Sequence, residues 1–118
     1  MPNFFQKLMR QLGAKDGPSA DRDDLVRDAL LKHGDDGCLP RDTVFYFYGG
    51  DFPALATEAE REGYAVRATA KSDGVILSKT IPVDREAFAP VRRQMETWAE
   101  TFGCEYDGWE AAVTARPN

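Results

Sequence analysis

Carboxylate side chains gather in two short segments of the sequence, and they are its first candidates for chemistry. Asp35 and Asp36 follow a segment with helical periodicity, and Glu105, Asp107 and Glu110 lie within six residues near the C-terminus. Hard divalent cations prefer oxygen ligands, and two neighbouring carboxyl groups can act as general acid and base. A divalent-metal or acid–base site is therefore one interpretation of these residues.

Two other interpretations need no bound ligand. A solvated acidic rim is the simplest, because surface carboxylates are common and water satisfies them. The third is a docking surface for a basic partner segment, with Trp109 or Tyr46 as an aromatic anchor. Neither the spacing of the carboxylates nor the single histidine, His33, favours a metal. The sequence thus predicts no metal site, no cofactor and no catalytic residue.

The elements that position these carboxylates follow from hydrophobic periodicity and from turn residues. A helix is predicted from about Asp21 to His33, with Gly34 as its stop. The other predicted elements are strands at residues 43–48, 64–71, 75–81 and 104–109, a short helix that Asp51 caps, and a helix opened by Asp84. Pro90 conflicts with one straight helix, so this last helix either begins near Ala89 or kinks at the proline.

This order of elements is β-α-β-β-α-β after a helix. It predicts an α+β, ferredoxin-like fold, in which a four-stranded antiparallel sheet carries two helices on one face. The first and fourth strands then pair antiparallel, which predicts that the five carboxylates named above share one end and one face of the sheet. Within the last strand, Gly108 predicts a bulge that lets Trp109 leave the regular pleat.

The same topology separates the two cysteines. Pairing of the first and last strands places Cys104 near Tyr48, at the far end of the first strand from Cys38. That strand spans about 20 Å at ~3.3 Å per residue, whereas a disulfide requires Cα atoms within ~7 Å. Two free thiols are predicted.

The sequence lacks residues that RNA binding and phosphate chemistry would each require on this fold. RNA-binding domains of this topology stack bases on aromatic side chains of the first and third strands, but residues 75–80 hold no aromatic side chain. A phosphate cradle after the first strand requires positive charge, and Gly49-Gly50 is followed by Asp51. We therefore expect neither an enzyme nor a direct nucleic-acid contact.

The N-terminal residues form a separate amphipathic segment. Phe4, Phe5, Leu8 and Met9 recur at helical spacing between basic and polar residues, and residues 14–20 have the composition of a linker. Such a short helix is marginal alone, so it is expected to pack on its own domain, on a second copy or on a partner; a membrane surface is a further alternative. The predicted division is residues 1–20 as this segment and residues 21–118 as the domain.

Composition narrows the class of protein. The chain has 118 residues, enough for one domain, and a net charge of −5, which disfavours nucleic acid as the main partner because phosphate contacts need a basic surface. No apolar run approaches the ~20 residues needed to cross a membrane. We expect a cytoplasmic, acidic protein with reduced thiols.

Four pieces of sequence resemble one known family, the ribonuclease E inhibitors called regulator of ribonuclease activity B. They are His33-Gly34-Asp35-Asp36, the aromatic strand after Pro40-Arg41, Glu62-Gly63-Tyr64-Ala65-Val66, and Glu105-Tyr106-Asp107-Gly108-Trp109. The last piece is the most specific, and the resemblance runs from about Asp21 to Trp109. It implies a ferredoxin-like domain that binds ribonuclease E away from its catalytic centre and lowers RNA turnover without catalysis of its own.

The resemblance leaves two hypotheses for the function. The first is an inhibitor of ribonuclease E whose partner is the non-catalytic region of that enzyme, bound through Asp35, Asp36, Glu105, Asp107, Trp109 and Glu110. The second is an interaction module of the same fold that binds another protein or forms a homodimer, placed by Phe4, Phe5, Leu8 and Met9 of the N-terminal helix.

Overall fold

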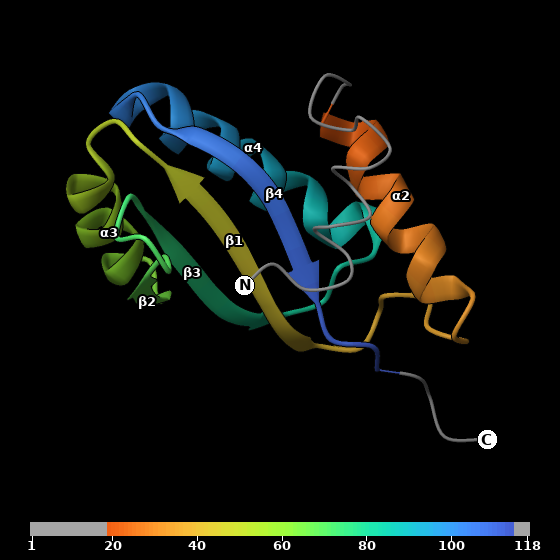
Figure 1. Ribbon diagram of the computed structural model, residues 1–118. Helices are drawn as coiled ribbons and strands as arrows, with labels where there is room; N and C mark the ends of the chain where they lie inside the picture. The colour runs from red at the N-terminus through yellow and green to blue at the C-terminus, as the bar shows by residue number, and fades with distance from the viewer. Residues whose placement is uncertain (1–18, 115–118) are drawn as a thin grey trace.

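The computed structural model describes residues 19–114 (Figure 1). Its elements are α2 (Ser19–Leu31), β1 (Arg41–Tyr48), α3 (Phe52–Arg61), β2 (Ala65–Ala68), β3 (Gly74–Ile81), α4 (Arg85–Phe102) and β4 (Glu105–Ala111). The four strands form one antiparallel sheet in the order β2-β3-β1-β4, so the described part of the chain is an α+β structure with three helices. The predicted N-terminal helix lies outside the described residues, and the division at residue 20 stays a prediction.

Strand β1 lies inside the sheet and directs alternate side chains to its two faces. Phe45 and Phe47 are fully buried on the helix side, whereas Tyr46 between them points to the opposite face. β1 pairs antiparallel with β3 along its whole length and with β4 on its other side. β2 extends the sheet beyond β3 as a short edge strand.

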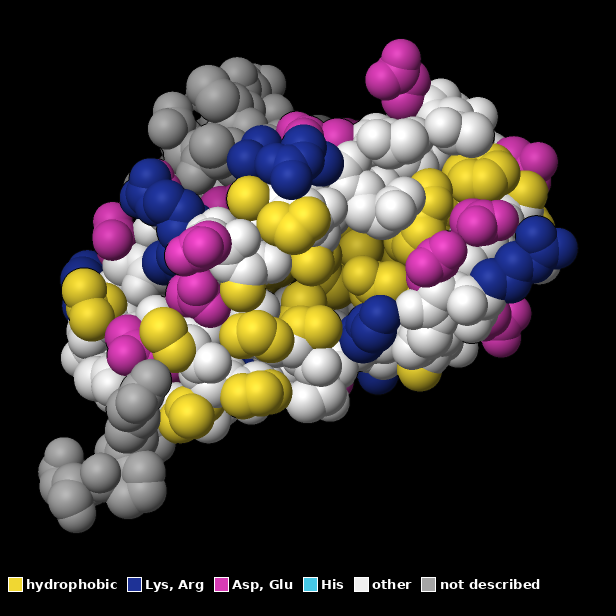
Figure 2. Space-filling model, turned by 180° about the vertical axis from the view of Figure 1, so that it is seen from behind, with side chains coloured by type: hydrophobic (Ala, Val, Ile, Leu, Met, Phe, Trp, Pro, Cys, Tyr) yellow, Lys and Arg dark blue, Asp and Glu magenta, His cyan; other side chains and the backbone are white. Residues whose placement is uncertain are grey.

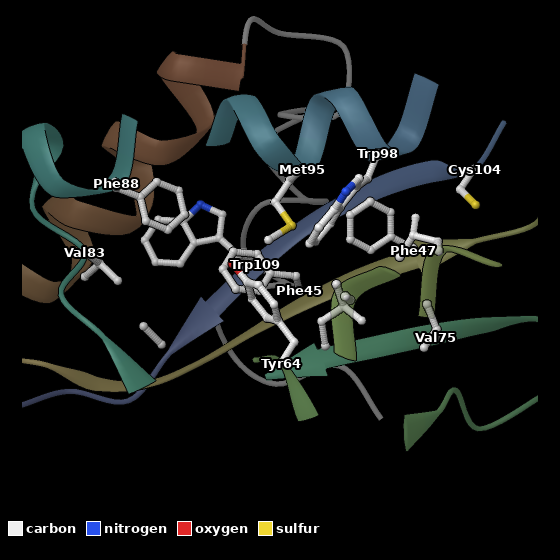
Figure 3. Close-up of a cluster of buried hydrophobic side chains, with 14 of the residues drawn as sticks. Phe45, Phe47, Tyr64, Val75, Val83, Phe88, Met95, Trp98, Cys104 and Trp109 are labelled. Atoms are coloured by element: carbon white, nitrogen blue, oxygen red, sulfur yellow. The ribbon is translucent and has the colours of Figure 1, made fainter. Parts of the chain in front are cut away.

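The core lies between this sheet and α4. Phe88, Met95 and Trp98 recur at helical spacing and are the buried residues of α4. Figure 3 shows these side chains pointing down toward Phe45 and Trp109 of the sheet. The rings of Phe88 and Phe45 stack at 6.1 Å between centroids. An apolar stripe on one helix face thus covers the aromatic strand.

Helix α4 resolves the conflict at Pro90. Asp84 caps the helix by accepting a hydrogen bond from the Ala87 amide at 3.3 Å, and the helix runs without a break from Arg85 to a left-handed Gly103. The alternative of a start near Ala89 is therefore wrong. The proline lies in the second turn, where it removes one helical hydrogen bond and leaves the first turn to be held by the cap.

The predicted bulge in β4 is confirmed. Phe45 pairs with Trp109 and Phe47 with Tyr106, so three steps along β4 match two steps along β1. Gly108 has a φ of 98°, a conformation that L side chains rarely adopt. The bulge brings both Tyr106 and Trp109 to the helix side, because a regular pleat would put residues three apart on opposite faces.

Other boundaries differ modestly from the sequence-based prediction. α2 begins and ends two residues earlier than predicted, and β2 stops at Ala68 because residues 69–73 form the turn. The Thr69 hydroxyl donates to Asp73 at 2.7 Å, so Thr69 belongs to the turn and not to the strand in which it was predicted. Cys38 and Cys104 are free thiols, as predicted. Among residues 19–114, no helix is both long and apolar enough to span a bilayer.

Candidate functional site at the terminal strand

Trp109 is a core residue. Its side chain is 1% exposed, and its ring lies 4.3 Å from the Phe88 ring between centroids. The indole Nε1–H donates a hydrogen bond to Asp23 Oδ1 at 2.9 Å. A partner has no access to this ring in the folded protein, so the interpretation of Trp109 as a surface anchor does not fit its position. Its contacts instead tie α2 and α4 to the sheet.

Asp23 is the buried carboxylate that sequence reasoning missed. It is 4% exposed, and its Oδ2 also pairs with Arg92 Nε of α4 at 3.2 Å. Burial raises the pKa of Asp23 to about 6, against the opposing effects of the Trp109 hydrogen bond and of nearby arginines. The signal was present in the spacing, because Asp23, Val26 and Leu30 lie on one face of α2. The helix dipole alone accounts for aspartates in a first helical turn, so the sequence does not single out Asp23 as a buried one.

Asp35 and Arg41 form a buried ion pair that fixes the end of β4. The guanidinium donates to both carboxylate oxygens, at 2.7 and 2.8 Å, and both residues are under 4% exposed. Asp35 also accepts the backbone amides of Gly37 and Thr114, while Arg41 donates to the Ala112 carbonyl. Burial alone would raise the pKa of Asp35, but these hydrogen bonds outweigh it and lower that pKa to about 2.

Glu110 lies on the face of the sheet opposite to the core. It pairs with Val44 of β1 and is 2% exposed. Its carboxylate is hydrogen-bonded to the Tyr46 hydroxyl, and Tyr46 is itself 5% exposed. Burial, followed by the Glu110 charge and this hydrogen bond, raises the pKa of Tyr46 well above its ordinary value. Neither side chain is an open contact point.

The remaining predicted carboxylates are dispersed. Asp36 is exposed and accepts the Cys38 amide at 3.0 Å. Glu105 is exposed but pairs with Tyr48, at the opposite end of β1 from Arg41. Asp107, beside the bulge, is 8% exposed.

The expectation that the five carboxylates share one end and one face is therefore wrong. Arg41, which pairs with Asp35, and Tyr48, which pairs with Glu105, are about 23 Å apart along β1 at ~3.3 Å per residue. The bulge in β4, the Asp35–Arg41 ion pair and the alternation of side chains along the strand direct these carboxylates to different parts of the sheet. Among residues 19–114, no group of three or more His, Cys, Asp or Glu side chains is arranged to hold a metal ion.

A charged cleft between α2 and α4 adjoins Asp23. Arg27 and Arg85 both donate to Asp24 Oδ1, at 3.1 and 2.8 Å. The lining consists of Asp23, Asp24, Arg27, Arg85, Ala89 and Arg92. The Arg85–Asp24 and Arg92–Asp23 pairs join α2 to α4, whereas the Arg27–Asp24 pair lies within α2. The charges of this cleft therefore hold the structure together.

A search of curated proteins finds no match for this chain. A family model described as regulator of ribonuclease activity B matches residues 20–111. The matched range begins within α2 and ends at the last residue of β4, so it includes the Asp23–Trp109 contact, the buried ion pair and the bulge. Because the match covers well over half of the chain, the protein belongs to the regulator of ribonuclease activity B family.

Proposed function

We propose that this protein is a non-catalytic regulator that binds ribonuclease E and lowers RNA turnover. Membership of its family implies regulation of ribonuclease activity, and this is the observation that carries the proposal. The strand order β2-β3-β1-β4 and the β-α-β-β-α-β sequence of elements support a ferredoxin-like arrangement for the domain, which we propose spans residues 21–118. We place its action in the cytoplasm, where ribonuclease E meets RNA.

The positions of the buried acidic residues support a binding function over a catalytic one. Asp23 and Asp35 are committed to hydrogen bonds and ion pairs that join secondary-structure elements. Glu110 is bonded to Tyr46. A general acid or base must reach a substrate proton within hydrogen-bond distance, and these three groups are buried.

The non-catalytic region of ribonuclease E is the partner that we propose. The family resemblance implies a basic, arginine-rich segment there, and the chain carries a net charge of −5. Opposite charges accelerate encounter and make binding weaken with salt. Of the predicted contact residues, Asp36 and Glu105 are exposed and Asp107 is buried, so we assign contact to Asp36 and Glu105. Asp35, Trp109 and Glu110 would act by holding the surface in shape.

A titration of the full chain against the isolated non-catalytic region of ribonuclease E, at low and at moderate salt, tests this proposal. We expect saturable binding that weakens with salt and that slows RNA cleavage by the intact enzyme. The variant Asp36→Asn with Glu105→Gln should bind more weakly than Asp28→Asn with Glu60→Gln, which removes two exposed charges elsewhere. Absence of binding at both salt concentrations would overturn the proposal.

A further inference from the structure

The helix side of the sheet is hollowed where α3 ends short of α4. With 10 and 18 residues, the two helices are about 15 and 27 Å long at ~1.5 Å per residue. α3 begins beside the end of α4, where the Asp51 amide donates to the Phe102 carbonyl at 2.8 Å. The first turns of α4 therefore extend past α3. Figure 2 shows hydrophobic side chains gathered in a hollow at the middle of this side, with acidic groups on both flanks and basic groups at the rim between them.

The floor of the hollow is the second half of β3. Val75 and Leu77 face the helices and are 3% and 0% exposed. The next two positions on the same face, Lys79 and Ile81, are only half-buried. Tyr64, which directly precedes β2, lies beside Lys79. The loss of burial along one face of one strand marks where helical cover ends.

The wall of the hollow is one flank of α4. The Trp98 ring meets the Tyr64 ring edge-on at 5.6 Å between centroids, so this flank faces Tyr64. Val91 lies seven residues earlier on the same flank, since seven residues make about two turns. The next residue, Arg92, belongs to the opposite flank and pairs with Asp23 of α2. Val91 is half-buried although its helix neighbours Phe88 and Met95 are fully buried.

Lys79 is an unusual residue for the helix side of an inner strand. Its Nζ donates to the Glu62 carbonyl at 2.8 Å and lies 4.7 Å from the centre of the Tyr64 ring. The carbonyl groups at the end of α3 and the face of an aromatic ring both attract cations. Lys79 thus covers part of an apolar floor with a long, half-buried side chain, held by one hydrogen bond and one ring contact that another group can replace.

We propose that this hollow, defined by Tyr64, Lys79, Ile81 and Val91, receives an apolar side chain from a basic segment of the ribonuclease partner. The inference rests on the proposed function and adds a second contact surface, on the helix side of the sheet, to the exposed carboxylates assigned above. Charge complementarity selects the occupant: the protein carries a net charge of −5, and acidic groups on both flanks of the hollow attract basic residues on either side of the inserted side chain, whereas Lys79 and the other basic groups at the rim oppose them. Insertion then buries the apolar surface that α3 leaves uncovered.

Calorimetric titration of the full chain with the isolated non-catalytic region of ribonuclease E tests the position of the contact. Val91→Arg fills the hollow and adds a positive charge there. Leu31→Arg makes the same charge change at a residue that is 61% exposed and outside the hollow. We expect Val91→Arg to weaken binding by about tenfold or more and Leu31→Arg by no more than about threefold.

A second pair of variants tests for an increase in affinity, the opposite of the change expected for Val91→Arg. Lys79→Met keeps the length of the side chain but removes the positive charge that repels a basic segment, so binding should tighten by about threefold. Lys71→Met removes the same charge from the exposed turn before β3, away from the hollow, and should leave the affinity unchanged or tighten it by much less than Lys79→Met. This pair decides the question if Val91→Arg does not fold, as judged by circular dichroism.

The possible outcomes separate this inference from the proposed function. In one outcome the unmodified chain binds, Val91→Arg and Leu31→Arg weaken binding equally, and Lys79→Met does not tighten it. That result overturns the hollow as the contact surface, and the proposed regulatory function stands. No binding by the unmodified chain overturns both. A concentration-dependent dimer of the unmodified chain that Val91→Arg dissolves would assign the hollow to residues 1–12 of a second copy and overturn the ribonuclease occupant.

Discussion

Burial of the Asp23 carboxylate raises its pKa, so the stability of the folded protein should depend on pH through this residue. Its pKa rises from 3.8 to about 6 on folding, so between those values the folded state binds more protons than the unfolded state. The free energy of unfolding should therefore fall as the pH rises from about 4 to 6 and level off above. At roughly 1.4 kcal/mol per pKa unit, the fall is on the order of 3 kcal/mol.

Asp23→Asn isolates this contribution. Asparagine keeps an acceptor for the Trp109 N–H but does not ionise, so urea unfolding of the variant should show a much smaller loss of stability between pH 4 and 7. If variant and unmodified chain lose the same stability over that range, the pH dependence arises elsewhere in the molecule.

Asp35 behaves in the opposite way, because its partners lower its pKa to about 2. The stability that it contributes is present above about pH 4 and is lost as the pH falls toward 2. Asp35→Asn leaves the buried Arg41 charge without its counter-charge and should cost about 3–5 kcal/mol at pH 7. Asp36→Asn, the same change at the adjacent exposed residue, should cost under about 1 kcal/mol. Equal costs in denaturant melts would contradict the structural role of the ion pair.

At the scale of elements, the sequence predicted the strands and helices because each carries a local signal. Alternation in β1, the Asp51 and Asp84 caps and the glycine stops are all readable from single segments. The start of α4 was left open because Pro90 argues locally against a helix, whereas the Asp84 cap and the burial of Phe88 outweigh the proline. Tertiary packing decided what propensity could not.

The candidate site was predicted less well than the fold. Strand pairing indicates which residues lie near one another, but burial depends on partners distant in sequence. Asp23 and Trp109 are 86 residues apart, and Asp35 and Thr114 are 79 apart. A run of acidic residues gives no sign that one of them will accept an indole N–H or a backbone amide. The predicted bulge at Gly108 turns Trp109 toward the core, so the ring cannot serve as the surface anchor of the docking interpretation.

At the scale of the whole molecule, charged contacts join parts that a simple sheet-and-helix packing would leave separate. Asp23 connects α2 to β4 and α4, Asp24 connects α2 to Arg85 at the start of α4, and the Asp35–Arg41 pair holds the residues after β4. Helix α2, which precedes the β-α-β-β-α-β unit, is thus tied to both of its layers. The helix should therefore not unfold independently.

This coupling predicts a single cooperative unfolding transition. Trp98→Phe leaves Trp109 as the one tryptophan, which reports on the α2–β4 contact, and Trp109→Phe leaves Trp98, which reports on the contact of α4 with Tyr64. Within each variant, the denaturant midpoint from fluorescence should coincide with that from far-ultraviolet circular dichroism, since a two-state domain loses all its structure together. A Trp109 transition at lower denaturant than the loss of helical signal would show that α2 detaches first. In that case the Asp23 contacts would break before the sheet unfolds, and the Asp23 carboxylate would be exposed to solvent in a partly folded state.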